Sequence, residues 1–228
     1  MPRVRDPRPK KIKPFMPRPH LPPVSIIKVW SSSHGKEDYG LPPALKVYLE
    51  RQQRSHLPPS SLTFEAKGGG KICPSVVSKV KRALRLSSGK AQCHVLILGT
   101  NNGRGENPEE PAVIAAYFKE ILEEAEGIPK SHVVVCGLLP SPEGAERNGP
   151  TTERFRETSS LLKDLTTGYS RSSFLDIPDF FTENGVVKEH LYRRKRGQPD
   201  IHFSRDGATL YAKALGQHIS FLRRETWL

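Results

Sequence analysis

Two uninterrupted apolar runs, Val95–Leu98 (VLIL) and Val133–Leu139 (VVVCGLL), constrain the fold of this chain more than any other feature. A strand with one face in water alternates apolar and polar residues, whereas a strand covered on both faces is apolar throughout. Both runs have the length and the β-branched content that are typical of strands. They therefore predict central strands of a sheet that carries helices on both faces.

The remainder of the chain after Pro23 alternates short strand-like segments with longer helical patterns, which is typical of a parallel sheet flanked by helices. A last helix is expected to begin after Ser204, its N-cap, and the Asn184-Gly185 pair predicts a tight turn. We expect strands at 25–30, 62–66, 94–98, 132–138 and 173–177, and helices at 44–53, 74–86, 109–126 and 152–165. The predicted fold class is α/β, a three-layer α/β/α sandwich with a central, mostly parallel sheet.

Positive charge is concentrated near the N-terminus. The 228 residues have a formal net charge of +12, and half of that excess lies in residues 1–23 together with eight of the 21 prolines. Because proline removes backbone donors and blocks helix formation, we expect a disordered basic arm over 1–23 and one domain over 24–228. Cations that could bind phosphate or anionic lipid there are Arg3, Arg5, Arg8, Lys10, Lys11 and Lys13. A solvated linker is the alternative interpretation of the arm.

The composition argues against several protein classes. Cys73, Cys93 and Cys136 are far apart and form no CxxC pair, so neither a disulfide framework nor a zinc site is predicted. No apolar run approaches the ~18 residues that a membrane-spanning helix needs, and the first residues contain no apolar signal-peptide core. We expect an intracellular protein, cytoplasmic or nuclear, that has no membrane span.

Polar and small residues follow three of the predicted strands, where ligands bind in open α/β sheets. Ser31–Ser33 follow the first strand, Gly68–Gly70 the second, and Asn101 lies just after the third. A serine on a strand-to-helix turn can act as a nucleophile, and a glycine N–H or an asparagine amide can stabilise an oxyanion. Taken singly, these residues also suit a polar loop, a flexible turn and an Asn-rich turn.

Asp200 and His202 come just before the last predicted helix, where a histidine could act as a general base. Serine after strand one, glycine after strand two, Gly-x-Asn after strand three and histidine before the last helix is the block order of the SGNH, or GDSL-like, hydrolases. The chain resembles that superfamily from about Ser25 to Leu222. A narrower resemblance is to the esterase domain encoded by the first open reading frame of some LINE-type retrotransposons.

The resemblance implies a flavodoxin-like SGNH fold and a serine esterase that needs no cofactor and no metal. It makes Ser33 the nucleophile and His202 the base, and it gives the oxyanion hole the N–H groups of Ser33 and Gly70 and the amide of Asn101. Three departures from the family pattern leave alternatives open. The fourth residue of the family's Gly-x-Asn-Asp block is Asn102 here. The Ser-Ser-Ser block could make Ser32 the nucleophile, and the family's aspartate three residues before the histidine is Pro199 here. The site could therefore be a Ser–His dyad, a triad completed by Asp200, or inactive.

Two functions follow from these observations. The first is hydrolysis of an acetyl or other carboxylic ester, with a small ester or an anionic lipid as the substrate. The second is an inactive SGNH-like domain that binds RNA or other nucleic acid through the basic arm and through a late cluster in a polar stretch that is typical of a solvated loop. That cluster consists of Arg193, Arg194, Lys195 and Arg196. The oligomeric state is not predicted.

Overall fold

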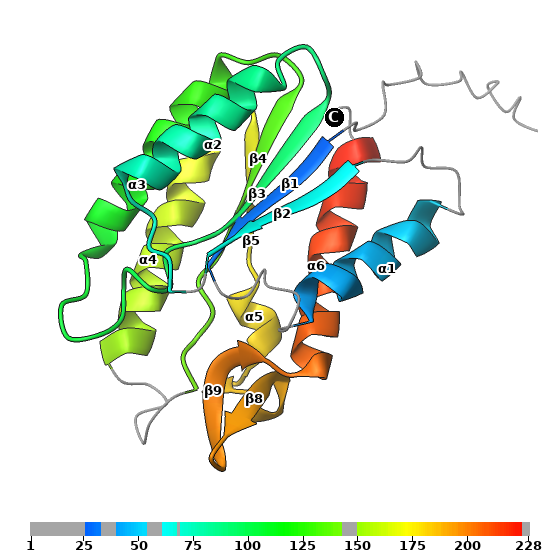
Figure 1. The fold of residues 1–228 in the computed structure, drawn as a ribbon. Coiled ribbons are helices and arrows are strands. Elements are labelled where there is room, and N and C mark those ends of the chain that lie inside the picture. The colour runs from blue at the N-terminus through cyan, green and yellow to red at the C-terminus, as the bar shows by residue number, and fades with distance from the viewer. Residues whose placement is uncertain (1–25, 33–39, 54–60, 68, 143–149, 225–228) are drawn as a thin grey trace, which may run out of the picture.

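The structure is a computed structural model that describes residues 26–32, 40–53, 61–67, 69–142 and 150–224 (Figure 1). Five parallel strands form its central sheet in the order β2-β1-β3-β4-β5. They are β1 (Ile26–Ser31), β2 (Ser61–Ala66), β3 (Gln92–Ile97), β4 (Ser131–Cys136) and β5 (Ser172–Leu175). All five lie within two residues of the starts predicted from the sequence, which confirms the parallel sheet.

Helices cover both faces of this sheet. On one face lie α2 (Pro74–Leu86), α3 (Pro111–Glu126) and α4 (Pro150–Thr167), and on the other lie α1 (Leu41–Gln53) and α6 (Arg205–Arg224) (Figure 1). Proline opens α2 and α3 at their first positions, where a missing N–H costs no hydrogen bond. The predicted three-layer α/β/α sandwich is therefore confirmed.

The continuous apolar runs divide between two cores because successive side chains of a strand point to opposite faces. In β4, Val134 and Cys136 pack with α1 and α6, whereas Val133 and Val135 pack with α2, α3 and α4. All six residues of β3 and of β4 are buried. This two-sided burial is the reason that these strands carry almost no exposed polar positions.

A smaller region of short elements follows β5. It contains α5 (Pro178–Phe181), the pair β6 (Thr182–Glu183) and β7 (Val186–Val187), a 3-10 turn η3 (Glu189–Leu191), and the antiparallel hairpin β8 (Tyr192–Lys195) and β9 (Gln198–Phe203). Asn184 and Gly185 both have positive φ, as the predicted turn requires. Figure 1 shows the β8–β9 hairpin beyond the carboxyl ends of the parallel strands, at the bottom of the view.

The structure differs from the sequence prediction at the late basic cluster. Arg193, Arg194 and Lys195 lie on strand β8, and only Arg196 lies in the turn, where its φ is 52°. The polar stretch is therefore an exposed hairpin and not an irregular loop. None of the helices in the described ranges is both long and apolar enough to cross a membrane.

Candidate active site

The carboxyl edge of the sheet has a switch point between β1 and β3. The chain runs outward from β1 to β2 on one side and from β3 to β5 on the other, and ligands bind at such a switch in open α/β sheets. Residues that follow β1, β2 and β3 meet at this edge. The β8–β9 hairpin, whose strand β9 includes Asp200 and His202, lies beyond the same edge (Figure 1).

Asn101 and Gly70 are in direct contact. The Nδ2 group of Asn101 donates a hydrogen bond to the Gly70 carbonyl oxygen at 3.1 Å. The N–H of Gly70 donates to the Lys67 carbonyl at 3.0 Å within its own turn, so its use as an oxyanion donor would require that bond to be released. An amide nitrogen has two N–H groups, so Asn101 retains a second donor while Gly70 orients it.

Asn102 joins the loops after β2 and β3. Its Oδ1 accepts a hydrogen bond from the Ile72 N–H at 2.9 Å, and its Nδ2 donates to the Ile72 carbonyl at 2.8 Å and to Glu109 at 3.0 Å. Asn102 is fully buried, so these bonds compete with no solvent. Sequence reasoning missed this positioning role and noted Asn102 only as a departure from the family's aspartate.

Asp200 reaches His202 directly. An Asp200 carboxylate oxygen lies 2.9 Å from Nδ1 of His202, and the two side chains are 21% and 16% exposed. On an extended strand, residues two apart share a face, which is why a spacing of two works here. Ile201 and Phe203 alternate with them and are buried. The carboxylate–imidazole contact therefore exists without an aspartate at position 199.

A bulge accompanies this pair. Tyr192 pairs with Phe203 and Arg194 pairs with Pro199, so a single β8 residue lies opposite the three β9 residues from Asp200 to His202. Bulges of this kind re-aim side chains and are common beside active sites. The extra residues of β9 are thus the ones that carry the candidate base and its carboxylate.

The Asp200 carboxylate is held in its charged form. Partial burial works to raise the pKa of Asp200, but the hydrogen bond and charge of His202, the Ile201 N–H and the charge of Lys195 outweigh it, so the pKa is lowered. An ionised carboxylate on Nδ1 fixes the tautomer in which Nδ1 carries the hydrogen. Nε2 is then the nitrogen that can accept a proton from a nucleophile.

The hairpin that carries this pair is tied to the sheet and to α6. The Tyr192 hydroxyl donates to the Pro140 carbonyl at 2.8 Å, next to the carboxyl end of β4. Ser204 donates to the His190 carbonyl at 2.8 Å and accepts from the Gly207 N–H at 3.1 Å. The second bond is the predicted N-cap of the last helix. These contacts hold β9 against the start of α6.

Two of the three serines Ser31–Ser33 lie within the described residues. Ser31 is the last residue of β1, and its hydroxyl donates to the Ser32 carbonyl at 3.1 Å. Ser32 is 2% exposed. Ser33, the predicted nucleophile, lies outside the described residues.

The predicted anion-binding residues are also only partly described. The six cations of the N-terminal arm lie outside the described residues. Arg193, Arg194, Lys195 and Arg196 are exposed, and Arg194 lies 3.9 Å from the Glu189 carboxylate. In the part of the chain that the structure describes, no three His, Cys, Asp or Glu side chains gather as metal ligands would.

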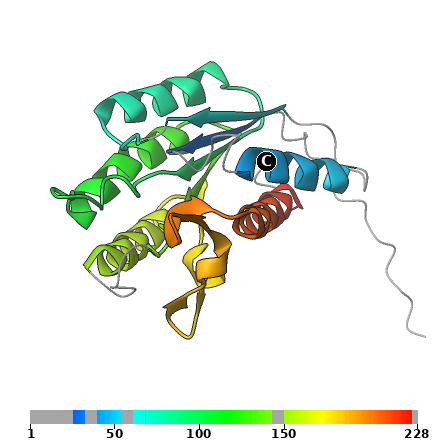
Figure 2. The ribbon, with the colours of Figure 1, turned by 60° about the horizontal axis from the view of Figure 1, so that its bottom comes forward.

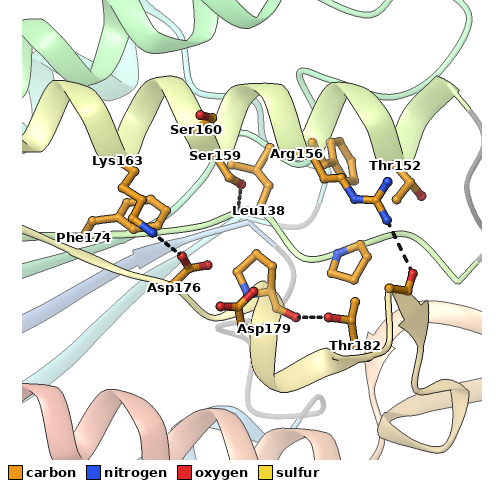
Figure 3. A pocket seen from close by; sticks show the side chains of 14 residues that line it. Leu138, Thr152, Arg156, Ser159, Ser160, Lys163, Phe174, Asp176, Asp179 and Thr182 are labelled. Atoms are coloured by element: carbon orange, nitrogen blue, oxygen red, sulfur yellow. Dashed lines mark hydrogen bonds and ion pairs between the residues drawn. The ribbon is translucent and has the colours of Figure 1, made fainter.

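A cavity of about 440 Å³ lies apart from these pairs, between α4 and the segment from β5 to β7 (Figure 3). Its charged groups are of both signs. Lys163 contacts Asp176 at 2.9 Å, and the Arg156 guanidinium donates to the Gly185 carbonyl at 3.5 Å. The cations in this cavity thus already have partners of their own.

Solved structures with the same architecture were found for most of the chain. The lipase/acylhydrolase from Enterococcus faecalis has a TM-score of 0.66 at 12% identity, over 86% of this chain and 96% of that one. A GDSL-like lipase from Bacteroides thetaiotaomicron has a TM-score of 0.64 at 12% identity, over 86% and 88%. This chain has the SGNH-hydrolase fold. Est24, a carbohydrate acetylesterase from Sinorhizobium meliloti, has the same fold, with a TM-score of 0.64 at 14% identity over 87% and 99%.

The likeness concerns the fold alone, because the identities of these three structures to the chain are only 12% to 14%. No protein-family model matches the chain, and no curated protein matches it in sequence. The narrower resemblance to retrotransposon esterase domains therefore stays a prediction, as do the division at residue 23 and the catalytic roles of the site residues.

Proposed function

We propose that this SGNH-fold chain is a serine esterase that hydrolyses carboxylic esters through an acyl-enzyme. The observation that carries the proposal is the 2.9 Å contact between the Asp200 carboxylate and Nδ1 of His202. In a serine hydrolase, a carboxylate on Nδ1 holds the imidazole in the orientation and tautomer that let Nε2 take the serine proton. The esterases and acylhydrolases that share the fold support the same reaction class.

The first half of the reaction forms the acyl-enzyme. Ser33 Oγ attacks the ester carbonyl carbon, and Nε2 of His202 takes the serine proton. The developing oxyanion accepts hydrogen bonds from the second N–H of Asn101 and from the backbone N–H of Ser33. The imidazolium then gives its proton to the departing alcohol oxygen as the C–O bond breaks. Asp200 stabilises the imidazolium and is not itself protonated.

The second half releases the acid. Water attacks the acyl carbonyl, His202 takes one water proton, and the ester bond to Ser33 breaks with return of that proton to Oγ. The products are one alcohol and one carboxylic acid, and the enzyme is regenerated. Asn101 serves both steps, so its removal would slow acylation and deacylation alike.

Turnover of p-nitrophenyl acetate by the full chain tests the proposal. His202→Ala is expected to abolish the activity, and Asp200→Asn is expected to lower kcat about 10⁴-fold, because an amide favours the wrong tautomer. Asn101→Ala is expected to lower kcat by ~10²–10³ with little change in Tm. Matched controls are His190→Ala and Asp206→Asn, which alter exposed residues near the same hairpin and are expected to retain activity.

The nucleophile is identified separately. A fluorophosphonate probe forms a stable bond to an activated serine, and mass spectrometry of the labelled peptide separates Ser33 from Ser32. Labelling is expected on Ser33, with Ser33→Ala inactive and Ser32→Ala active. A purified protein whose turnover equals that of buffer, and which takes up no probe, would overturn the proposal.

Nucleic-acid binding is a second candidate, supported by the exposed cations of β8 and by the charge of residues 1–23. Such binding must weaken with salt because phosphate contacts release counterions. Deleting residues 1–23 and neutralising Arg193–Arg196 together is expected to abolish RNA binding. RNA affinity that survives both changes would exclude this role.

The intracellular location stays a prediction from the cysteine pattern.

A further inference from the structure

A groove between α1 and α6 is used by none of the steps above. The two helices lie side by side on one face of the sheet (Figures 1 and 2). The groove has a volume of about 780 Å³. Its apolar lining includes Ala44, Val47 and Tyr48 of α1 and Ala208 and Ala212 of α6. Val47 is 45% exposed and Ala44 and Tyr48 are half-buried, so the α1 side of this lining is open to a ligand, whereas Ala208 and Ala212 are buried beneath it.

All the charged side chains that line the groove are cationic. They are Arg51 on α1, Arg193 on β8, and Arg205 and Lys213 on α6. Within the described ranges, Arg51, Arg205 and Lys213 take part in no ion pair. This sets the groove apart from the cavity beside α4, where Lys163 is paired with Asp176.

Cationic side chains beside an apolar surface favour a ligand that has an anionic group next to a hydrocarbon portion. The positive potential attracts an anionic group, and the apolar lining favours a hydrocarbon portion next to it. Gly40 and Ser204, which immediately precede α1 and α6, also line the groove, so two helix N-termini add positive partial charge at one end. An anionic amphiphile satisfies both requirements, whereas a neutral ester satisfies only one.

The groove also reaches the end of the strand that carries the candidate base. Phe203 and Ser204 line it, and they directly follow His202 in the chain. A molecule in the groove therefore lies beside the strand that carries the Asp200–His202 pair. Along α1 the lining extends from Pro43 to Arg51, about 12 Å of helix. That length suits a short hydrocarbon chain with an anionic end.

We propose that the α1–α6 groove binds the non-reacting end of the substrate, and that this end is an apolar chain that carries a phosphate or carboxylate. The inference rests on the proposed esterase function, and it narrows the substrate class to anionic amphiphilic esters. Remote binding of this kind is used to position the ester carbonyl at the reacting groups.

Binding of octyl phosphate, which has no carboxylic ester to hydrolyse, tests the groove independently of catalysis. Calorimetry with the full chain, below the micelle concentration, compares the wild type with the double variant Arg51→Gln/Lys213→Gln. The variant is expected to bind about tenfold more weakly, because it loses two cation–anion contacts. Octanoate reports whether a carboxylate serves as well as a phosphate, and uncharged octyl glucoside is expected to bind no more tightly to the wild type than to the variant.

The matched control is Lys79→Gln/Arg82→Gln, which removes the same charge from exposed positions of α2 on the other face of the sheet. It is expected to leave octyl phosphate binding unchanged. Equal affinity of the wild type and the groove variant, or equal losses in the groove and control variants, would overturn the inference. Single-stranded RNA that binds the groove more tightly than octyl phosphate, and loses affinity in the groove variant alone, would also overturn it.

A pair of substrates connects the groove to turnover. Mono-p-nitrophenyl suberate and p-nitrophenyl octanoate have the same chain length, and only the suberate carries a terminal carboxylate. The groove variant is expected to lower kcat/KM about tenfold for the suberate and to leave that for the octanoate unchanged. If the protein hydrolyses p-nitrophenyl octanoate but does not bind octyl phosphate, the esterase proposal stands and the inference that the groove binds an anionic amphiphile is overturned. Octyl phosphate binding without any ester turnover defeats the esterase proposal and the substrate assignment.

Discussion

His94, a buried histidine of β3, is predicted to make the fold sensitive to acid. The indole N–H of Trp30 donates to Nδ1 of His94 at 3.1 Å, and Nε2 of His94 lies 2.9 Å from the Oε1 atom of Gln92. Nδ1 must be an acceptor to receive the indole N–H, so Nε2 carries the single ring hydrogen. Protonating Nδ1 would place two donors against each other in a fully buried site.

The size of the effect follows from the pKa of His94. Burial, with a smaller contribution from the charge of Lys28, lowers this pKa from 6.5 to about 4. Between these two pKa values, His94 is protonated in the unfolded chain but neutral in the folded chain. The free energy of unfolding therefore falls as the pH drops from about 6.5 to about 4. The full loss is about 3 kcal/mol, of which roughly 2 kcal/mol is already lost at about pH 5.

Urea denaturation followed by circular dichroism measures this loss at about pH 7.5 and pH 5 in the wild type and in His94→Gln. Glutamine retains an acceptor for Trp30 but does not titrate, so the variant is expected to lose roughly 2 kcal/mol less between the two conditions. His132, whose pKa burial also lowers to about 4, is present in both proteins and cancels. Equal losses in both proteins would refute the reasoning.

Two further predictions concern substitutions that would either remove buried hydrogen bonds or cause a steric overlap. Asn102→Ala is expected to destabilise the fold by about 2–5 kcal/mol in urea denaturation, because it strips the fully buried Ile72 N–H and carbonyl of their partners. Gly207→Ala is expected to lower Tm by several degrees although alanine favours helices, because its Cβ would overlap the Leu191 carbonyl. Gly127→Ala, where nothing lies closer than 3.7 Å, is the control and is expected to leave Tm almost unchanged.

The central sheet could be predicted because its signals are local. A strand that is apolar throughout is stable where both of its faces are covered. The VLIL and VVVCGLL runs are therefore expected between two helical layers. Pro74 and Pro111 mark helix starts through their own ring geometry, and the N-cap role of Ser204 needs only the N–H of Gly207. Each of these features depends on residues only a few positions apart.

The hairpin that carries the candidate base could not be predicted in the same way. The run from Arg193 to Lys195 shows no apolar alternation, because the strand is exposed. Its pairing with β9 includes a bulge, which changes the register without a sequence mark. Without the strand, the spacing of Asp200 and His202 seemed one residue short. The extended backbone resolves that difference because it places both side chains on one face.

The separation of β8 and β9 from the main sheet has a consequence for heat inactivation. A two-stranded hairpin is only marginally stable by itself, and peripheral units of this kind open at a lower free energy than the central strands. Such an opening must break the hydrogen bonds from Tyr192 to Pro140 and from Ser204 to His190, and it must expose the buried rings of Tyr192 and Phe203. Proton transfer would then cease while the five parallel strands remain paired, so ester turnover would fail at a lower temperature than the far-ultraviolet signal of the sandwich.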